Sequence, residues 1–183
     1  MEERISVVVL GPRDWRDLRA IRLEALRSEP AAFSSSYEET LAWSDEDWRR
    51  RLTNDHRLHL VARIQNCPIG IVGGYLGSDE GDDSVAVVFG MFVTREHRGW
   101  GIGRLLLTSL IDRLLAFPQI ATIRLWVTQT RNPARALYES VGFQVVGKTA
   151  EGIVIDDRQY DELIMELRVQ LASSFLPSSG DSG

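Results

Sequence analysis

The sequence lacks paired cysteines, long hydrophobic runs and clusters of basic residues. Cys67 is the single cysteine, so the chain can form no internal disulfide. The first twenty residues carry charges at positions 2, 3, 4, 13, 14, 16, 17 and 19, which leaves no signal-peptide core, and no apolar run approaches the roughly 18 residues of a membrane span. A net charge of −5 without a Lys/Arg-rich run disfavours nonspecific nucleic-acid binding. We therefore expect a cytoplasmic protein with no nucleic-acid and no membrane partner.

The glycine-rich segment 98–104, Arg-Gly-Trp-Gly-Ile-Gly-Arg, lacks the marks of two common nucleotide sites. A dinucleotide fingerprint needs a third glycine where Arg104 or Leu106 stands, and an ATP loop needs Gly-Lys-Ser/Thr. The segment nevertheless lies between an apolar run at 85–93 and a helix-periodic stretch at 105–115. A strand, a glycine loop and a helix start in this order present free backbone N–H groups and a positive helix end to a phosphate. We therefore expect a phosphorylated ligand that is neither a dinucleotide nor ATP.

A second motif lies at residues 132–143, which read Asn-Pro-Ala-Arg-Ala-Leu-Tyr-Glu-Ser-Val-Gly-Phe. Asn132 suits a helix N-cap, Pro133 the first helical position and Gly142 the end of the helix. On such a helix, residues 132 and 138 lie within roughly 120° of each other, so both can border one groove.

Together these motifs resemble those of the GNAT N-acetyltransferase family. The pattern Arg-x-x-Gly-x-Gly at positions 98, 101 and 103 is similar to the family's loop for the pyrophosphate of acyl-CoA. An Asn followed six residues later by Tyr138 and then by Gly-Phe is similar to the family's second signature. Residues 23–39 also resemble the first helix and acceptor-side segment of one bacterial branch. The resemblance extends from about Ile5 to Arg168.

The order of expected elements predicts an α/β (α+β) sandwich with a mixed sheet. The resemblance narrows this to the GNAT fold, a mostly antiparallel central sheet flanked by helices. With 183 residues and 44% hydrophobic side chains, the chain can bury one sizeable core. We expect a single N-acetyltransferase domain over residues 1–171 and a disordered, small and polar tail over 172–183. Hydrophobic patterning predicts strands at 5–10, 58–64, 69–76, 85–93, 123–127, 144–146 and 160–167, and helices around 15–25, 44–52, 105–115 and 133–141.

The family resemblance implies a reaction and its cosubstrate. An acetyl group passes from acetyl-CoA to a primary amine of a small molecule, a peptide or a protein, by direct attack within a ternary complex. A CoA-binding module without efficient catalysis is the alternative, and slow acetyl-CoA hydrolysis that no amine stimulates would favour it. The acceptor amine and the oligomeric state, a homodimer included, stay open at this point.

The resemblance also assigns roles to residues. It implies that Tyr138 is the acid that protonates the leaving thiolate, whereas an arbitrary tyrosine would more often be a core residue with its hydroxyl at the edge. It implies that a backbone amide near residues 91–93 stabilises the oxyanion. Asn132 is either a cofactor contact or simply a helix cap. The cofactor-binding residues implied are Met91, Phe92, Val93, Arg98, Gly99, Trp100, Gly101, Ile102, Gly103, Arg104, Asn132, Arg135 and Tyr138.

The residue that accepts the proton of the amine is not evident from the sequence. We call the glycine-rich segment 98–104 the phosphate loop. Several relatives place a glutamate on the strand before this loop, but residues 85–93 contain neither a carboxylate nor a histidine. We expect either a water relay or a carboxylate from elsewhere, such as Glu38 or Glu39. No metal is expected, because no cysteine and no acidic partner completes a ligand set with His56 and His59.

Overall fold

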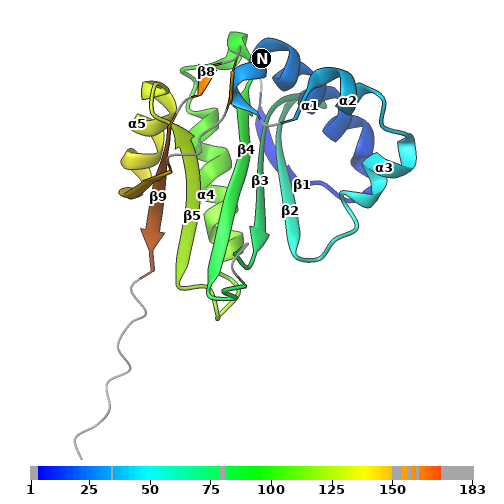
Figure 1. Ribbon diagram of the computed structural model, residues 1–183. Coiled ribbons are helices and arrows are strands. Elements are labelled where there is room, and N and C mark those ends of the chain that lie inside the picture. Colours follow the sequence, from blue (N-terminus) through cyan, green and yellow to red (C-terminus); the bar gives the residue numbers. More distant parts are fainter. Residues whose placement is uncertain are drawn as a thin grey trace, which may run out of the picture.

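The computed structural model describes residues 4–33, 35–78, 81–149, 154–155, 158–159 and 161–169, and its centre is a seven-stranded sheet in the order β1-β2-β3-β4-β5-β9-β6 (Figure 1). Neighbouring strands run antiparallel except β4 and β5, which are parallel, so the predicted mixed and mostly antiparallel sheet is confirmed. The strands are β1 (Ile5–Val9), β2 (Arg57–Ile64), β3 (Cys67–Leu76), β4 (Val85–Val93), β5 (Thr122–Thr128), β6 (Gln144–Thr149) and β9 (Glu162–Arg168), and β7 (Val154–Ile155) pairs separately with β8 (Arg158–Gln159). The predicted tail at 172–183 lies outside the described residues.

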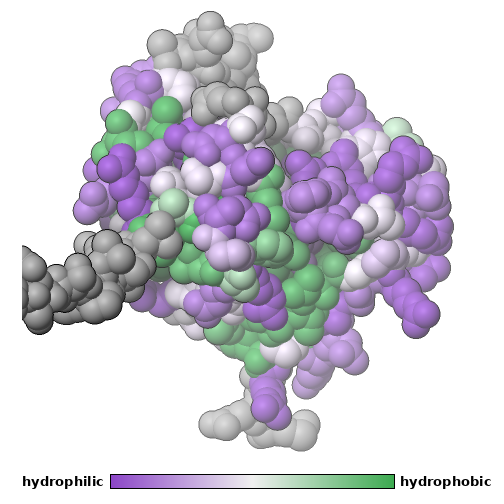
Figure 2. Space-filling model, turned by 90° about the horizontal axis from the view of Figure 1, so that it is seen from below, coloured by the Kyte–Doolittle hydropathy of each residue, from purple (hydrophilic) through white to green (hydrophobic). Residues whose placement is uncertain are grey.

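Helices cover both faces of this sheet. They are α1 (Trp15–Ser28), α2 (Tyr37–Leu41), α3 (Asp45–Arg50), α4 (Ile102–Leu114) and α5 (Asn132–Val141). Figure 1 shows α1, α2 and α3 grouped at the β1–β3 end of the sheet and α5 at the β9 end. Seen from below, hydrophilic side chains cover the α1–α3 half of the molecule and border a band of hydrophobic surface (Figure 2). Within the described residues, no helix combines the length and the apolar character of a membrane span.

Two hydrophobic clusters hold these layers together. On one face, α4 buries a stripe at three- and four-residue spacing, including Leu106 and Leu110, against strand residues such as Leu60. On the opposite face, α1 buries Trp15, Leu18, Ile21 and Ala25 against Val61, Ile71 and Phe92. Leu60 and Val61 are consecutive in β2 and therefore point to opposite faces, so the central strands are buried on both sides.

Local sequence signals explain the hairpin that joins β2 to β3. Gln65 and Asn66 have positive φ angles of 49° and 67°, as a two-residue turn matched to the twist of the strands requires. The strands expected at 58–64 and 69–76 are thus present and pair as a hairpin, but the turn between them is shorter than the gap left by those expected ranges. Cys67 and Pro68 already belong to β3.

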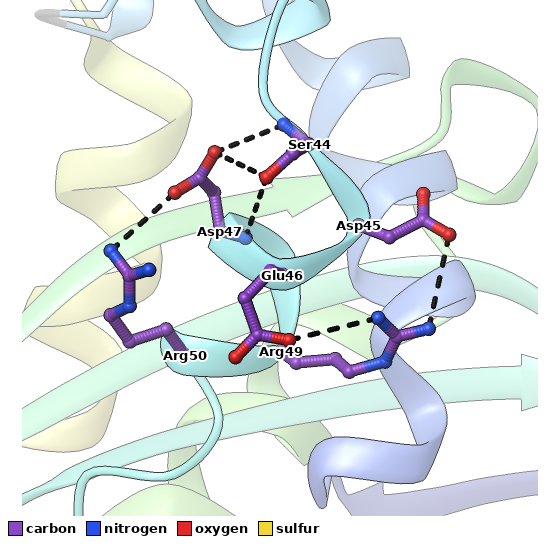
Figure 3. Close-up of polar contacts among 6 residues, drawn as sticks. All are labelled: Ser44, Asp45, Glu46, Asp47, Arg49 and Arg50. Atoms are coloured by element: carbon purple, nitrogen blue, oxygen red, sulfur yellow. Dashed lines mark hydrogen bonds and ion pairs between the residues drawn. The ribbon is translucent and has the colours of Figure 1, made fainter.

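Helix α3 begins with a reciprocal cap (Figure 3). Ser44 Oγ accepts a hydrogen bond from the Asp47 N–H at 3.2 Å, and Asp47 Oδ2 accepts one from the Ser44 N–H at 3.0 Å. The helix expected around residues 44–52 is therefore present, but it ends at Arg50 and leaves Leu52 outside it.

Candidate active site

The parallel strands β4 and β5 pair only at one end. Val85–Val87 lie opposite Thr122–Arg124, and beyond this short ladder the strands diverge (Figure 1). Residues 88–93 therefore keep an unpaired backbone edge that faces the free edge of residues 125–128. Such an edge offers N–H and C=O groups to an extended ligand in the way that a sheet accepts an added strand. Both edges line one cavity of about 580 Å³.

A bulge in β4 contributes to this divergence. The register between β3 and β4 shifts between Ile71 and Gly73, and Gly90 adopts a φ of +64°. An extra residue at positive φ bends the strand locally and increases its twist. Gly90 and its neighbour Phe89 both line the cavity at this bend.

The glycine-rich loop closes the other end of the cavity. Gly99 and Gly101 have φ angles of +82° and +78°, and a Cβ built on either would meet no atom within 4 Å. Gly101 is the N-cap of α4, so no side chain caps the helix, and the first helical bond runs from the Leu105 N–H to the Gly101 carbonyl at 3.0 Å. Within the described chain, the N–H groups of residues 99–104 donate to no protein oxygen. Free N–H groups at the positive end of a helix form an anion site, and a pyrophosphate fits it.

Gly103 has a different role from the other two glycines of the loop. A Cβ there would lie 3.1 Å from Leu137 Cδ2, so this glycine lets α5 approach α4 closely. Arg104 adds a hydrogen bond from its guanidinium to the Ser140 carbonyl at 3.2 Å. The contact places α5 and its tyrosine beside the phosphate loop.

Tyr138 reaches the cavity from the α4 side of the sheet. It is 7% exposed, packs edge-on against Phe143 with ring centroids 6.1 Å apart, and lines the cavity. Its hydroxyl has no hydrogen-bond partner among the described residues. Burial raises the pKa of the Tyr138 phenol to about 12. The group is therefore protonated at neutral pH and free to donate into the cavity.

Glu29, which follows α1, connects two arginines at the rim. It pairs with both Arg98 and Arg131, and the Arg98 Nε donates to the Val93 carbonyl at 3.0 Å. Burial alone would raise the pKa of Glu29, but the hydrogen bonds from Arg131 and Arg98 outweigh it and hold that pKa below its ordinary value. The Arg98 guanidinium thus ties the end of β4 to the end of α1.

Glu162 is a carboxylate of the cavity that the sequence analysis did not identify. It begins β9 opposite Thr128, lines the cavity and forms no ion pair within the described chain. Its neighbours Leu163 and Met165 pack in the α4-side cluster, so by alternation Glu162 faces the opposite side of the sheet. Burial raises the pKa of Glu162 above its ordinary value.

Most of the residues suggested by the sequence come together here. Those that line the cavity are Met91, Phe92, Val93, Arg98, Gly99, Gly101, Ile102, Gly103, Arg104 and Tyr138.

Other suggested residues lie outside the cavity lining. Trp100 is 56% exposed and packs edge-on against His97, and Arg135 pairs with Glu139 on the exposed face of α5. Asn132 is the first residue of α5, with Arg131 rather than Asn132 at the N-cap and no side-chain cap, because the helix begins one residue earlier than predicted. Glu38 and Glu39 are exposed on α2, outside the lining of the cavity.

Comparison with known proteins agrees with this architecture. The family model of the Acetyltransferase (GNAT) family matches residues 15–143. The N-alpha-acetyltransferase RimI of Mycobacterium tuberculosis is 31% identical over 137 residues, which cover 72% of this chain and 83% of that protein. Two solved structures show the same fold. A GNAT-family acetyltransferase from Streptococcus pneumoniae has a TM-score of 0.78 at 19% identity, covering 91% of this chain and 100% of that one. The ribosomal-protein-S18-alanine N-acetyltransferase of Escherichia coli has a TM-score of 0.71 at 22% identity, covering 94% and 99%.

The family model spans α1, β4, the glycine-rich loop, β5 and α5, which supply most of the cavity lining. The chain belongs to the GNAT acetyltransferase family, and it is an acetyl-CoA-dependent N-acetyltransferase.

Proposed function

We propose that the cavity between β4 and β5 holds acetyl-CoA and delivers its acetyl group to a primary amine of a small molecule, a peptide or a protein. The observation that supports this most strongly is that one cavity joins three features: the unpaired edge of β4, the uncapped start of α4 and the buried Tyr138. The N–H groups of residues 99–104 would hold the pyrophosphate. The free edge of residues 88–93 would hold the extended arm.

Acetyl-CoA, when bound, supplies an acyl group that is already activated as a thioester. The chain must therefore orient the two reactants and manage two protons. Tyr138 holds a proton on its phenol oxygen, with a pKa of about 12, and can donate it to the leaving sulfur.

The second proton belongs to the acceptor. An alkyl ammonium with a reference pKa near 10.4 is mostly protonated at neutral pH and cannot attack until it loses that proton. We assign Glu162 as the proton acceptor, because burial makes its carboxylate more basic than an exposed one. Glu162 faces the opposite side of the sheet from the cluster that contains Tyr138, so the acid and the base approach the thioester from different sides.

The name of the mycobacterial relative suggests one class of acceptor. RimI is named as an N-alpha-acetyltransferase, which supports the α-amine at the start of a peptide or protein as a candidate here. Small-molecule amines form the second class of acceptor, because a cavity of about 580 Å³ has the size of a small-molecule binding site.

Two measurements on the purified protein test the proposal. Calorimetry should show saturable binding of CoA, and release of free thiol from acetyl-CoA should accelerate when an amine acceptor is added from a panel of amino acids, peptides and polyamines. Slow hydrolysis that no amine accelerates would favour the CoA-binding module without efficient catalysis. Absence of CoA binding would overturn the cofactor assignment itself.

A further inference from the structure

Three arginines and one histidine gather on the face of the sheet that carries α1–α3. Arg22 comes from α1, Arg51 follows α3, and Arg57 and His59 belong to β2. Arg57 and His59 contact the ring of Phe89, whereas Arg22 lies over Phe33 and Arg51 over Trp43.

We call Arg22, Arg51 and Arg57 the arginine cluster, because the charge of Arg51 acts on Arg22 and the charge of Arg57 acts on Arg51. The Arg57 guanidinium lies 4.9 Å from the Phe89 ring centroid, and the His59 ring meets Phe89 edge-on at 5.5 Å. A Cβ on Gly90 would lie 3.7 Å from the Arg22 Nη1.

The positive charges of the arginine cluster are not balanced by acidic residues. None of the three arginines forms an ion pair within the described chain, whereas Arg63 and Arg131 nearby each do. All three are half-buried, and burial together with the charge of Arg51 lowers the pKa of Arg22 to about 10. Like charges kept close together and partly out of water are unfavourable unless an anion joins them. In a protein with a net charge of −5, this arrangement indicates a binding role.

Asp47 is a carboxylate whose charge acts on Arg51, but it already has other partners. Asp47 raises the pKa of Arg51, but burial and the charge of Arg57 outweigh it, so that this pKa lies below its ordinary value. Asp47 also accepts hydrogen bonds from Ser44 and pairs with Arg50 at 3.5 Å (Figure 3).

His59 provides an independent indication of a polar site beside the arginine cluster. Its side chain is 7% exposed, and its Nε2 is buried without a hydrogen-bond partner among the described residues. Buried polar atoms in native proteins are nearly always paired, so an unpaired one next to three cations indicates a site for a ligand or its hydration water.

No arginine of the cluster lines the reaction cavity itself, but Arg22 and Arg57 contact aromatic residues of its lining at a place remote from the phosphate loop. Phe33, Phe89 and Gly90 line that cavity, and Arg22 lies over the Phe33 ring at 4.6 Å and donates to Ser35 Oγ at 3.3 Å. The loop follows the end of β4, whereas the cluster lies against the middle of the strand. A second cavity of about 410 Å³, lined by Trp43, Arg51 and Arg57 among others, extends from the cluster.

We propose that the acceptor carries an anionic group, a carboxylate or a phosphate, in addition to its amine, and that Arg22, Arg51 and Arg57 bind this group. The inference rests on the proposed function, because it assigns the cluster to the acceptor of the same cavity. Guanidinium groups suit both anions through paired hydrogen bonds. Polycations such as spermidine are disfavoured by repulsion.

Matched pairs of amines, titrated calorimetrically into the CoA-saturated protein, test the proposal. Phosphoethanolamine is compared with ethanolamine, and β-alanine with β-alaninamide, so that each pair differs in the anionic group. We expect at least one acidic member to bind at least about tenfold more tightly than its counterpart, which corresponds to about 1.4 kcal/mol, and the pair that responds identifies phosphate or carboxylate. Arg22→Gln and Arg57→Gln should each remove this preference. Arg49→Gln should retain it, because Arg49 is paired with Asp45 and Glu46.

A second readout needs no substitution in the cluster. The chain has three histidines, so the His59 imidazole signals can be assigned by NMR and titrated with and without inorganic phosphate. An anion on the cluster should raise the pKa of His59 by about one unit or more. Equal binding within both pairs, or an unchanged His59 titration, would overturn the inference. Failure of the protein to bind CoA would instead overturn the proposed function.

Discussion

At the scale of single residues, burial affects Tyr138 and Glu162 in ways that suit opposite tasks. Removal from water raises the pKa of both side chains. For the phenol this keeps a proton available for donation at neutral pH. For the carboxylate it increases the affinity for a proton taken from an amine.

Removal of the Tyr138 hydroxyl should lower turnover without affecting cofactor binding. Tyr138→Phe keeps the ring that packs against Phe143, so CoA affinity by calorimetry should be nearly unchanged. General acid catalysis contributes roughly 10²- to 10⁴-fold, and kcat should fall within this range. Wild-type kcat, measured with an acceptor for which chemistry limits the rate, would contradict the acid role.

Glu162 should determine the acidic limb of the pH–rate profile. A base acts only when it is deprotonated, so kcat/KM should fall as the pH drops through the pKa of Glu162, which burial places above the ordinary carboxyl value. Glu162→Gln should abolish this limb and lower the rate by roughly 10²-fold or more. The control Glu139→Gln changes an exposed carboxylate paired with Arg135 and should leave the profile intact. Persistence of the limb in Glu162→Gln would show that another group, or a water relay, accepts the proton.

The sequence identifies some of these residues and not others for a physical reason. Tyr138 stands at a fixed offset from a helix start and a terminal glycine, so local spacing is enough to place it. Glu162 and Glu29 lie 133 residues apart in the sequence but line the same cavity. The residues next to either carboxylate in the sequence do not indicate this proximity. Glu162 simply alternates with the buried Leu163 and Met165, as any solvent-facing strand residue would.

At the scale of elements, periodic patterns predict the strands and helices well, but they do not predict where two strands part. Residues 122–128 form one continuous strand, and nothing in their pattern marks the point after Arg124 where pairing with β4 stops. The divergence accompanies the β4 bulge at Gly90, which shows itself only in the register with β3 and is therefore nonlocal. The phosphate loop, in contrast, is local and was predictable from its glycines.

The phosphate loop can be tested with a control matched for backbone strain. Gly101→Val places a branched side chain where an anion would approach, and it also forces valine into a φ of +78°. Gly81→Val imposes a similar strain at φ +82°, with equally open surroundings, in the loop between β3 and β4. Both variants should lose comparable stability in denaturant unfolding, but only Gly101→Val should bind CoA more weakly. Equal CoA affinity of the two variants would place the pyrophosphate elsewhere.

At the scale of the whole molecule, charge is distributed unevenly. Arg98 and Arg131 are paired with Glu29 at the rim of the cavity, whereas the arginine cluster has no ion-pair partner among the described residues. The cluster affects stability through His59, whose pKa is lowered to about 4 by burial and by the charges of Arg57, Arg22 and Arg51.

The free energy of unfolding should therefore depend on pH through His59. The unfolded chain binds a proton near the ordinary pKa of 6.5 and the folded chain only near 4, so stability is fully present above about pH 6.5 and is lost as the pH falls toward 4. The complete loss amounts to about 3 kcal/mol. His59→Gln should flatten this dependence in urea unfolding between pH 5 and 7, whereas the exposed His56→Gln should preserve it. Identical slopes in the two variants would contradict the burial of a neutral His59.

We expect acetyl-CoA to occupy the cavity between β4 and β5, and backbone hydrogen exchange of the protein with and without CoA can locate it. The N–H groups of residues 99–104 and the unpaired edge of residues 88–93 have few protein partners, so their exchange should slow when CoA binds. Amides of the β1–β2 ladder should change little. Saturable CoA binding that protects other segments and leaves residues 88–93 and 99–104 unchanged would contradict the account.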